Sequence, residues 1–119
     1  MKFTLVLCVL ACALAIAHGA TQYTSKFDGF DVDMVLANKR ILQNYIKCLN
    51  DKGPCTNEGR ELKKLLPDAL ASDCSKCTEV QKKNSQKVVE HLRKNTPADF
   101  DNLLKKYDPK GAYRAKHGL

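Results

Sequence analysis

The chain has 119 residues, of which 44% are hydrophobic and six are cysteines, and its formal net charge is +7. This length is sufficient for one domain with one core. Acidic and basic residues are interspersed with no like-charge run longer than two, which argues against a nucleic-acid-binding surface and favours solvated helix faces.

The first 19 residues have the composition of a secretory signal peptide. Lys2 supplies a positive charge, Leu5 to Ala17 form an uncharged apolar run, and Ala17 and Gly19 are small residues placed for cleavage after Gly19. The run is too short for a membrane span. We therefore expect a signal peptide at 1–19 and a secreted, extracellular domain at 20–119, with no stable membrane insertion.

The next segments have the spacing of amphipathic helices. A short apolar stripe at 32–36 follows Asp31, a plausible N-cap, and a second stripe at 41–49 has helical rather than alternating spacing. A Gly-Pro pair then turns the chain. A third stripe covers 62–70, and Pro67 inside it predicts a kink or a break in that helix.

The second half of the chain continues the helical pattern. Thr78 and Gln81 have the spacing of a capping box at the start of a long helix that extends to about residue 95. Thr96 is expected to cap the following helix, with Pro97 in its first position and an apolar stripe at 100–107. A turn at 108–111 precedes a short helix. The pattern predicts an all-α, single-domain bundle of five to six helices without strands.

Four cysteines remain after the predicted cleavage: Cys48, Cys55, Cys74 and Cys77. An even number in a short secreted chain indicates two disulfides. A zinc site is disfavoured because the first gap is longer than those usual in zinc sites, and a thioredoxin-like role would need strands that are absent from the pattern. Four cysteines permit three pairings; the local one, 48 with 55 and 74 with 77, needs no long-range closure.

The spacing C-x6-C-x18-C-x2-C resembles that of the insect chemosensory proteins, also called the OS-D-like family. The segments "YTSKFDGFDVDMVLANKRILQNYIKCL", "CTNEGRELKKLLPDAL", "CSKCTEVQK", "KVVEHLRKN" and "KYDPKGAYR" resemble blocks of the same family, so the likeness covers essentially the whole predicted mature chain. The resemblance implies six α-helices around an internal hydrophobic channel, disulfides between adjacent cysteines, and binding of long-chain lipids or semiochemicals. One departure is Phe100, which stands where family members often carry tryptophan.

The candidate ligand-binding residues lie on the apolar stripes. Periodicity alone cannot separate a core position from one that lines a cavity, and for Tyr45 it favours plain core. The resemblance implies a channel wall, in which the Tyr45 hydroxyl could meet a polar ligand head. The expected lining is Ile41, Tyr45, Leu62, Leu66, Val88, Leu92, Phe100 and Leu103.

No catalytic, cofactor or metal motif is present in the sequence, and His91 is interpreted as a structural histidine. We therefore expect a non-enzymatic, monomeric carrier whose partner is a small hydrophobic ligand. The alternatives are a secreted hydrolase or oxidoreductase, and a cationic helical protein that acts at membranes or as a developmental or interaction factor. The membrane alternative would need a concentrated basic helix face, whereas the basic residues here are spread out.

Overall fold

The computed structural model describes residues 21–119, and the predicted signal peptide at 1–19 lies outside them. The described residues contain six helices and no strand, which confirms the all-α prediction. The helices are α2 (Val32–Ala37), α3 (Lys39–Leu49), α4 (Asn57–Ala71), α5 (Glu79–Asn95), α6 (Pro97–Tyr107) and α7 (Ala112–His117). None of these helices is both long and apolar enough to cross a membrane.

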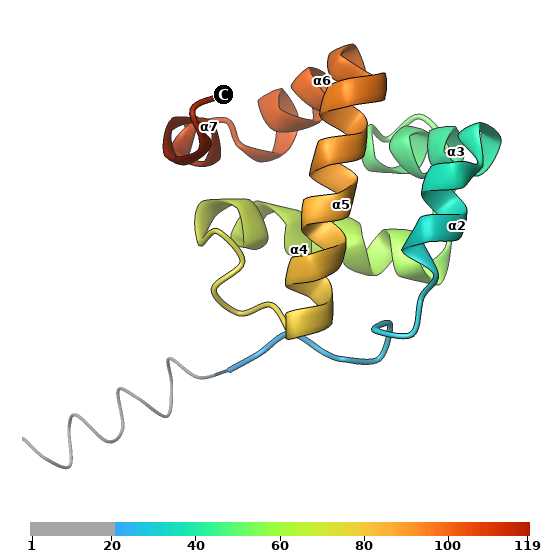
Figure 1. Cartoon of the computed structure of the whole chain (residues 1–119), viewed down its shortest axis with the longest axis horizontal. Coiled ribbons are helices and arrows are strands. Elements are labelled where there is room, and N and C mark those ends of the chain that lie inside the picture. The colour runs from blue at the N-terminus through green and yellow to red at the C-terminus, as the bar shows by residue number, and fades with distance from the viewer. Residues whose placement is uncertain (1–20) are drawn as a thin grey trace, which may run out of the picture.

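The helices cross one another around a single apolar interior (Figure 1). The central helix α5 contacts α2 and α6, while α4 contacts α3, α6 and α7. The buried core takes residues from α2, α3, α5 and α6, namely Val35, Leu42, Ile46, Leu49, Leu92, Leu103 and Tyr107. Sequence-distant stripes thus converge on one interior, as expected of amphipathic helices.

Side-chain caps define where several helices begin. The Asp31 carboxylate accepts a hydrogen bond from the Met34 N–H at 3.0 Å, as predicted for α2. The capping box of α5 is also confirmed: Thr78 Oγ1 accepts the Gln81 N–H at 3.1 Å, and Gln81 Oε1 accepts the Thr78 N–H at 2.9 Å. Each cap satisfies backbone donors that the first turn of a helix leaves without partners.

Helix α6 begins at the predicted residue, with Thr96 as N-cap and Pro97 in the first position, but without a side-chain capping hydrogen bond. The Thr96 hydroxyl instead donates to the carbonyl oxygen of Leu92 at 3.5 Å. Thr96 is also the C-cap of α5, because its N–H donates to the same Leu92 oxygen at 2.9 Å. Its hydroxyl therefore closes α5, and Pro97 begins α6 without a side-chain cap.

Pro67 does not break α4, which continues from Asn57 to Ala71. The proline lacks the N–H that would bond to the Lys63 carbonyl one turn earlier. Because Pro67 is exposed, water can satisfy that carbonyl. The predicted break is therefore wrong, and α4 continues past the proline.

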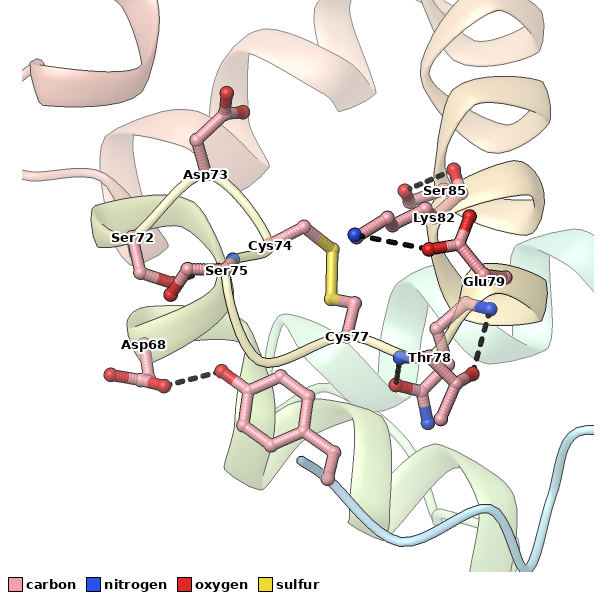
Figure 2. Close-up of a disulfide and its surroundings, with 12 residues drawn as sticks. Asp68, Ser72, Asp73, Cys74, Ser75, Cys77, Thr78, Glu79, Lys82 and Ser85 are labelled. Atoms are coloured by element: carbon pink, nitrogen blue, oxygen red, sulfur yellow. Dashed lines mark hydrogen bonds and ion pairs between the residues drawn. A yellow bond between two sulfur atoms is a disulfide. The ribbon is translucent and has the colours of Figure 1, made fainter. Parts of the chain in front are cut away.

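Both disulfides join neighbouring cysteines, which confirms the local pairing. Cys48 and Cys55 link the end of α3 to the residue before the α4 cap, with a Cα–Cα distance of 5.0 Å. Cys74 and Cys77 close the loop between α4 and α5 at the same Cα–Cα distance, just before Thr78 (Figure 2). Neither bridge joins helices across the apolar interior.

Candidate functional site

The apolar interior is the candidate ligand-binding site, and most of the predicted lining residues meet there. Leu92 and Leu103 are buried in the core. A second group is partly buried and packs against that core, and its predicted members are Ile41, Tyr45, Leu66, Val88 and Phe100. The helices α3, α4, α5 and α6 thus each contribute at least one predicted residue.

Leu62 is the exception. Its side chain is 43% exposed and lies outside the apolar cluster, although Leu66 one turn later packs against it. Periodicity identifies which face of a helix is apolar, but not how far along the helix its neighbours cover that face. The expectation that Leu62 lines the interior is therefore corrected.

Tyr45 lies where α3 meets the start of α4. Its ring makes an edge-to-face contact with Phe30, with centroids 5.9 Å apart, and the Thr56 hydroxyl donates to the Tyr45 hydroxyl oxygen at 3.2 Å. Gly59 allows the start of α4 to pack closely against α3, because a Cβ at Gly59 would lie only 3.1 Å from Cys48 Sγ. The Tyr45 hydroxyl keeps its own hydrogen free to donate, because the Thr56 proton already occupies its oxygen.

A buried hydrogen bond joins α6 to the last residue of α3. The Tyr107 hydroxyl donates to the carbonyl oxygen of Leu49, and both residues belong to the core. Burial raises the pKa of the Tyr107 phenol, so this group remains a protonated donor at neutral pH. The interaction ties the end of α6 to the end of α3.

One carboxylate and two lysines lie near this hydrogen bond. Asp51, in the loop after α3, pairs with Lys63 of α4 and Lys106 of α6. Hydrogen bonds from Lys106 and Lys63 lower the pKa of the Asp51 carboxyl to about 2. One exposed carboxylate thereby connects three segments of the chain.

The C-terminal helix α7 is attached by polar contacts. The Asp73 carboxylate, in the α4–α5 loop, lies 2.9 Å from Lys116 Nζ and 2.8 Å from His117 Nε2. The buried Asp108 accepts the backbone N–H groups of Tyr113 and Arg114 at 3.1 and 3.2 Å. Asp108 therefore acts as the cap for a helix that begins after a glycine.

Two surface hollows lie outside the predicted lining. A hollow of about 520 Å³ between α2 and α5 has Leu36 and His91 among its walls. We call the other the cationic hollow; its volume is about 380 Å³, and its walls are Thr24, Lys26, Phe27, Asn57, Arg60, Glu61 and Lys64. Neither hollow contains a predicted channel residue, so the channel that the resemblance implies stays a prediction. Residues 21–119 contain no group of three or more potential metal ligands.

A model described as the insect pheromone-binding family, A10/OS-D, matches residues 23–115. The chain belongs to the A10/OS-D family. Ejaculatory bulb-specific protein 3 of Drosophila melanogaster is 49% identical over 95% of this chain and 88% of its own length. Putative odorant-binding protein A10 of the same species is 50% identical over 80% of this chain and 61% of its own length.

Solved structures of similar proteins show the same fold. A chemosensory protein in complex with bromo-dodecanol is 46% identical to this A10/OS-D chain, with a TM-score of 0.76. The match covers 80% of this chain and 95% of that protein. The two share the helical architecture, and the resemblance seen in the cysteine spacing is confirmed.

Sequence reasoning missed several residues of this A10/OS-D interior. Phe30, Leu36 and Leu70 are partly buried and pack against the core, yet none was selected as a candidate. Leu70 lies one turn after Leu66 on the same stripe, so periodicity could have identified it. Phe30 precedes the first helix, where no periodic signal exists.

Proposed function

We propose that this protein is a carrier that reversibly binds a long apolar molecule between its helices. The single observation that carries the proposal is the structural relative named for its complex with bromo-dodecanol, at 46% identity and a TM-score of 0.76. A dodecyl chain is long, flexible and apolar, and these properties define the ligand class proposed here. Binding is non-covalent and involves no catalysis.

The proposed binding surface is the inward side of four helices. Five of the predicted lining residues are only partly buried at the border of the core: Ile41, Tyr45, Leu66, Val88 and Phe100. Their present contacts with each other can therefore be replaced by contacts with a ligand. Burying twelve methylenes would return about 10 kcal/mol before the costs of ordering, at about 0.8 kcal/mol each. Micromolar affinity corresponds to about −8 kcal/mol, so it requires burial of the whole chain and an ordering cost no larger than about 2 kcal/mol.

Entry of such a ligand requires the helices to move apart. The two disulfides support this because each closes a short loop, with sequence separations of 7 and 3, and neither joins helices across the core. Contacts between helices depend on side-chain packing and on exposed ion pairs such as Lys87–Asp33, which joins α5 to α2. Exposed ion pairs contribute little to stability and can rearrange.

We also propose that carriage occurs outside the cell, by a monomer that begins near Ala20. The apolar run at the N-terminus and the two disulfides support export to an oxidising compartment. The mass of intact secreted protein tests this directly. Recovery of Cys8 in the secreted chain would contradict the predicted cleavage.

The carrier function can be tested by displacement of an environment-sensitive dye with dodecanol, using secreted protein stripped of lipid. Leu66→Glu should weaken dodecanol binding by about tenfold or more, a loss of about 1.4 kcal/mol. Leu62→Glu is the matched control, since it adds the same charge to α4 one turn away at an exposed position and should change the affinity by less than about twofold.

Circular dichroism must show that both variants keep their helix content. If Leu66→Glu does not fold, the milder Leu66→Ala and Phe100→Ala replace it, with a smaller expected loss. Absence of any dodecanol binding below about 100 μM by folded wild-type protein would refute the carrier function.

A further inference from the structure

The cationic hollow, defined above by its seven wall residues, is separate from the apolar interior. Its walls come from two segments, residues 24–27 before α2 and the first half of α4. None of its residues belongs to the apolar cluster. It is an open surface hollow of about 380 Å³, and five of its seven wall residues are exposed: Thr24, Lys26, Asn57, Arg60 and Lys64.

The charges of the cationic hollow are unbalanced. Lys26, Arg60 and Lys64 face a single acidic residue, Glu61. Within residues 21–119, none of these three cations has a carboxylate at ion-pair distance, whereas the adjacent Lys63 pairs with Asp51. The three cations of the hollow therefore outnumber its one carboxylate, and none of them is engaged in an ion pair within residues 21–119.

Neutral contacts hold Arg60 in place. Its guanidinium donates to the Asn57 side-chain oxygen and, at 3.4 Å, to the carbonyl oxygen of Cys55. These two contacts use only part of the five N–H donors of an arginine. The remaining donors are available to a planar anion, and the fixed fork suits a carboxylate.

The opposite wall is ordered and partly apolar. Thr24 is held by Gln81, whose side-chain amide donates to the Thr24 carbonyl at 2.9 Å, and the Lys26 N–H donates to Thr24 Oγ1 at 3.2 Å. Lys26 Nζ lies 5.3 Å from the centre of the Phe27 ring. The Lys26 ammonium thus lies over one face of the Phe27 ring, and the wall combines a cation with an aromatic group.

We propose that the cationic hollow binds a small organic carboxylate, with its anionic group between Arg60 and Lys64 and its apolar part against Phe27. The three cations give the charge complementarity, the Arg60 fork gives the carboxylate geometry, and the ring distinguishes an organic anion from a simple one. This site goes beyond the proposed carrier function, because it needs neither the apolar interior nor movement of the helices.

The test uses phenylacetate and the secreted, isotope-labelled chain, with backbone amide shifts recorded by nuclear magnetic resonance. Saturable shifts are expected at residues 24–27 and 57–64. Acetate, which lacks the ring, and 2-phenylethanol, which lacks the charge, should each bind at least about fivefold more weakly than phenylacetate. The affinity should fall as salt is raised through about 0.1 M, because the three cations are exposed.

The double variant Arg60→Gln with Lys64→Gln should weaken phenylacetate binding by at least about fivefold. Lys83→Gln with Lys94→Gln is the matched control: it removes the same charge from α5, and Lys94 lines the other hollow. The control should bind as the wild type does. Dodecanol displacement should be unchanged in both double variants, which separates this site from the carrier function.

Equal loss in the two double variants would overturn the proposal in favour of general electrostatic attraction. Shifts that map to other residues or do not saturate would also overturn it. Acetate binding as tightly as phenylacetate would refute the role given to Phe27. If circular dichroism shows that the Arg60 and Lys64 double variant is unfolded, the single variant Lys64→Gln is used, with a loss of at least about twofold expected.

Discussion

The Thr56 hydroxyl donates a hydrogen bond to the Tyr45 hydroxyl at 3.2 Å while it accepts the Gly59 N–H at 3.1 Å. One side chain therefore caps α4 and orients a ring at the border of the apolar interior. The Tyr45 hydroxyl keeps its own hydrogen, which it can donate to another group. A helix cap and a candidate ligand contact are thus coupled through a single hydroxyl group.

Tyr45→Phe should reduce the affinity for dodecanol by about two- to thirteenfold, because a hydrogen bond contributes about 0.5–1.5 kcal/mol. Binding of tridecane, which has no acceptor, should be unchanged, since the ring and its contact with Phe30 remain. Dye displacement with both ligands measures the difference. An equal loss for both would assign the effect to packing instead of the hydroxyl.

Gly59→Ala should lower the free energy of unfolding by about 1 kcal/mol. The added Cβ would lie 3.1 Å from Cys48 Sγ, 3.3 Å from Thr56 Oγ1 and 3.5 Å from Tyr45 Cδ1. Overpacking costs about 1–3 kcal/mol, which outweighs the gain of about 1 kcal/mol in helix propensity because the disulfide sulfur cannot swing away.

Urea denaturation followed by circular dichroism measures this change. Gly29→Ala is the control, since no atom lies within 4 Å of the position of its Cβ. A Gly59→Ala protein as stable as the wild type would show that α3 and α4 can separate at no cost.

The two disulfides should differ in their contribution to stability. The loop-entropy relation gives about 2.5 kcal/mol for the eight-residue loop of Cys48–Cys55 and about 2 kcal/mol for the four-residue loop of Cys74–Cys77. Cys48 is also 1% exposed, so Cys48→Ala with Cys55→Ala additionally loses buried contacts. Cys74 has a φ of 62°, a strained backbone that contributes no stability of its own.

Chemical denaturation of the two double variants should therefore rank the Cys48–Cys55 pair as the more costly loss. Each variant should retain its helices at moderate temperature. The reverse ranking would mean that the loop at 73–77 determines the stability of the chain more than the α3–α4 corner does.

Asp51 should contribute to acid sensitivity. Its pKa is lowered from 3.8 to about 2 by Lys106 and Lys63, so the folded state binds fewer protons than the unfolded state between these values. This contribution is complete above about pH 4 and is lost as the pH falls toward about 2. Asp51→Asn should therefore be less stable than the wild type at about pH 6, and the difference should vanish near pH 2.

Thermal unfolding across this pH range, at low salt, measures the contribution. Asparagine suits the φ of 60° at this position, so the substitution tests the charge and not the backbone. The effect should be small and salt-sensitive, because Asp51 is exposed. A difference that persists at the lowest pH would point to a lost hydrogen bond rather than to titration.

Local signals predicted much of the fold from the sequence. Asp31 and the Thr78–Gln81 capping box act within a single helical turn, so their geometry follows directly from spacing. The cysteines of each pair are close in the sequence, so their pairing could be predicted without the positions of the other helices. Thr96 occupies the predicted N-cap position of α6, but its hydroxyl bonds to α5, because two helices compete for it and spacing does not decide between them.

The site was predicted less completely because its residues depend on distant neighbours. Leu62 and Leu66 lie on the same apolar stripe of α4. The other helices cover Leu66 but do not reach Leu62, and the sequence of α4 does not show this difference. Asp108 looks like an ordinary turn residue in the sequence, yet it is buried and caps α7. The cationic hollow unites residues 24–27 with α4, a contact that no periodicity indicates.

The order of the cysteines along the chain has a consequence for oxidative folding. If the chain is exported from its N-terminus, as proposed above, Cys55 emerges seven residues after its partner Cys48, and Cys74 emerges nineteen residues after Cys55. The first bridge can therefore form before either thiol of the second pair emerges. Under such export, the order of emergence would favour the native pairing among the three possible ones and reduce the need for an isomerase to reshuffle mispaired intermediates.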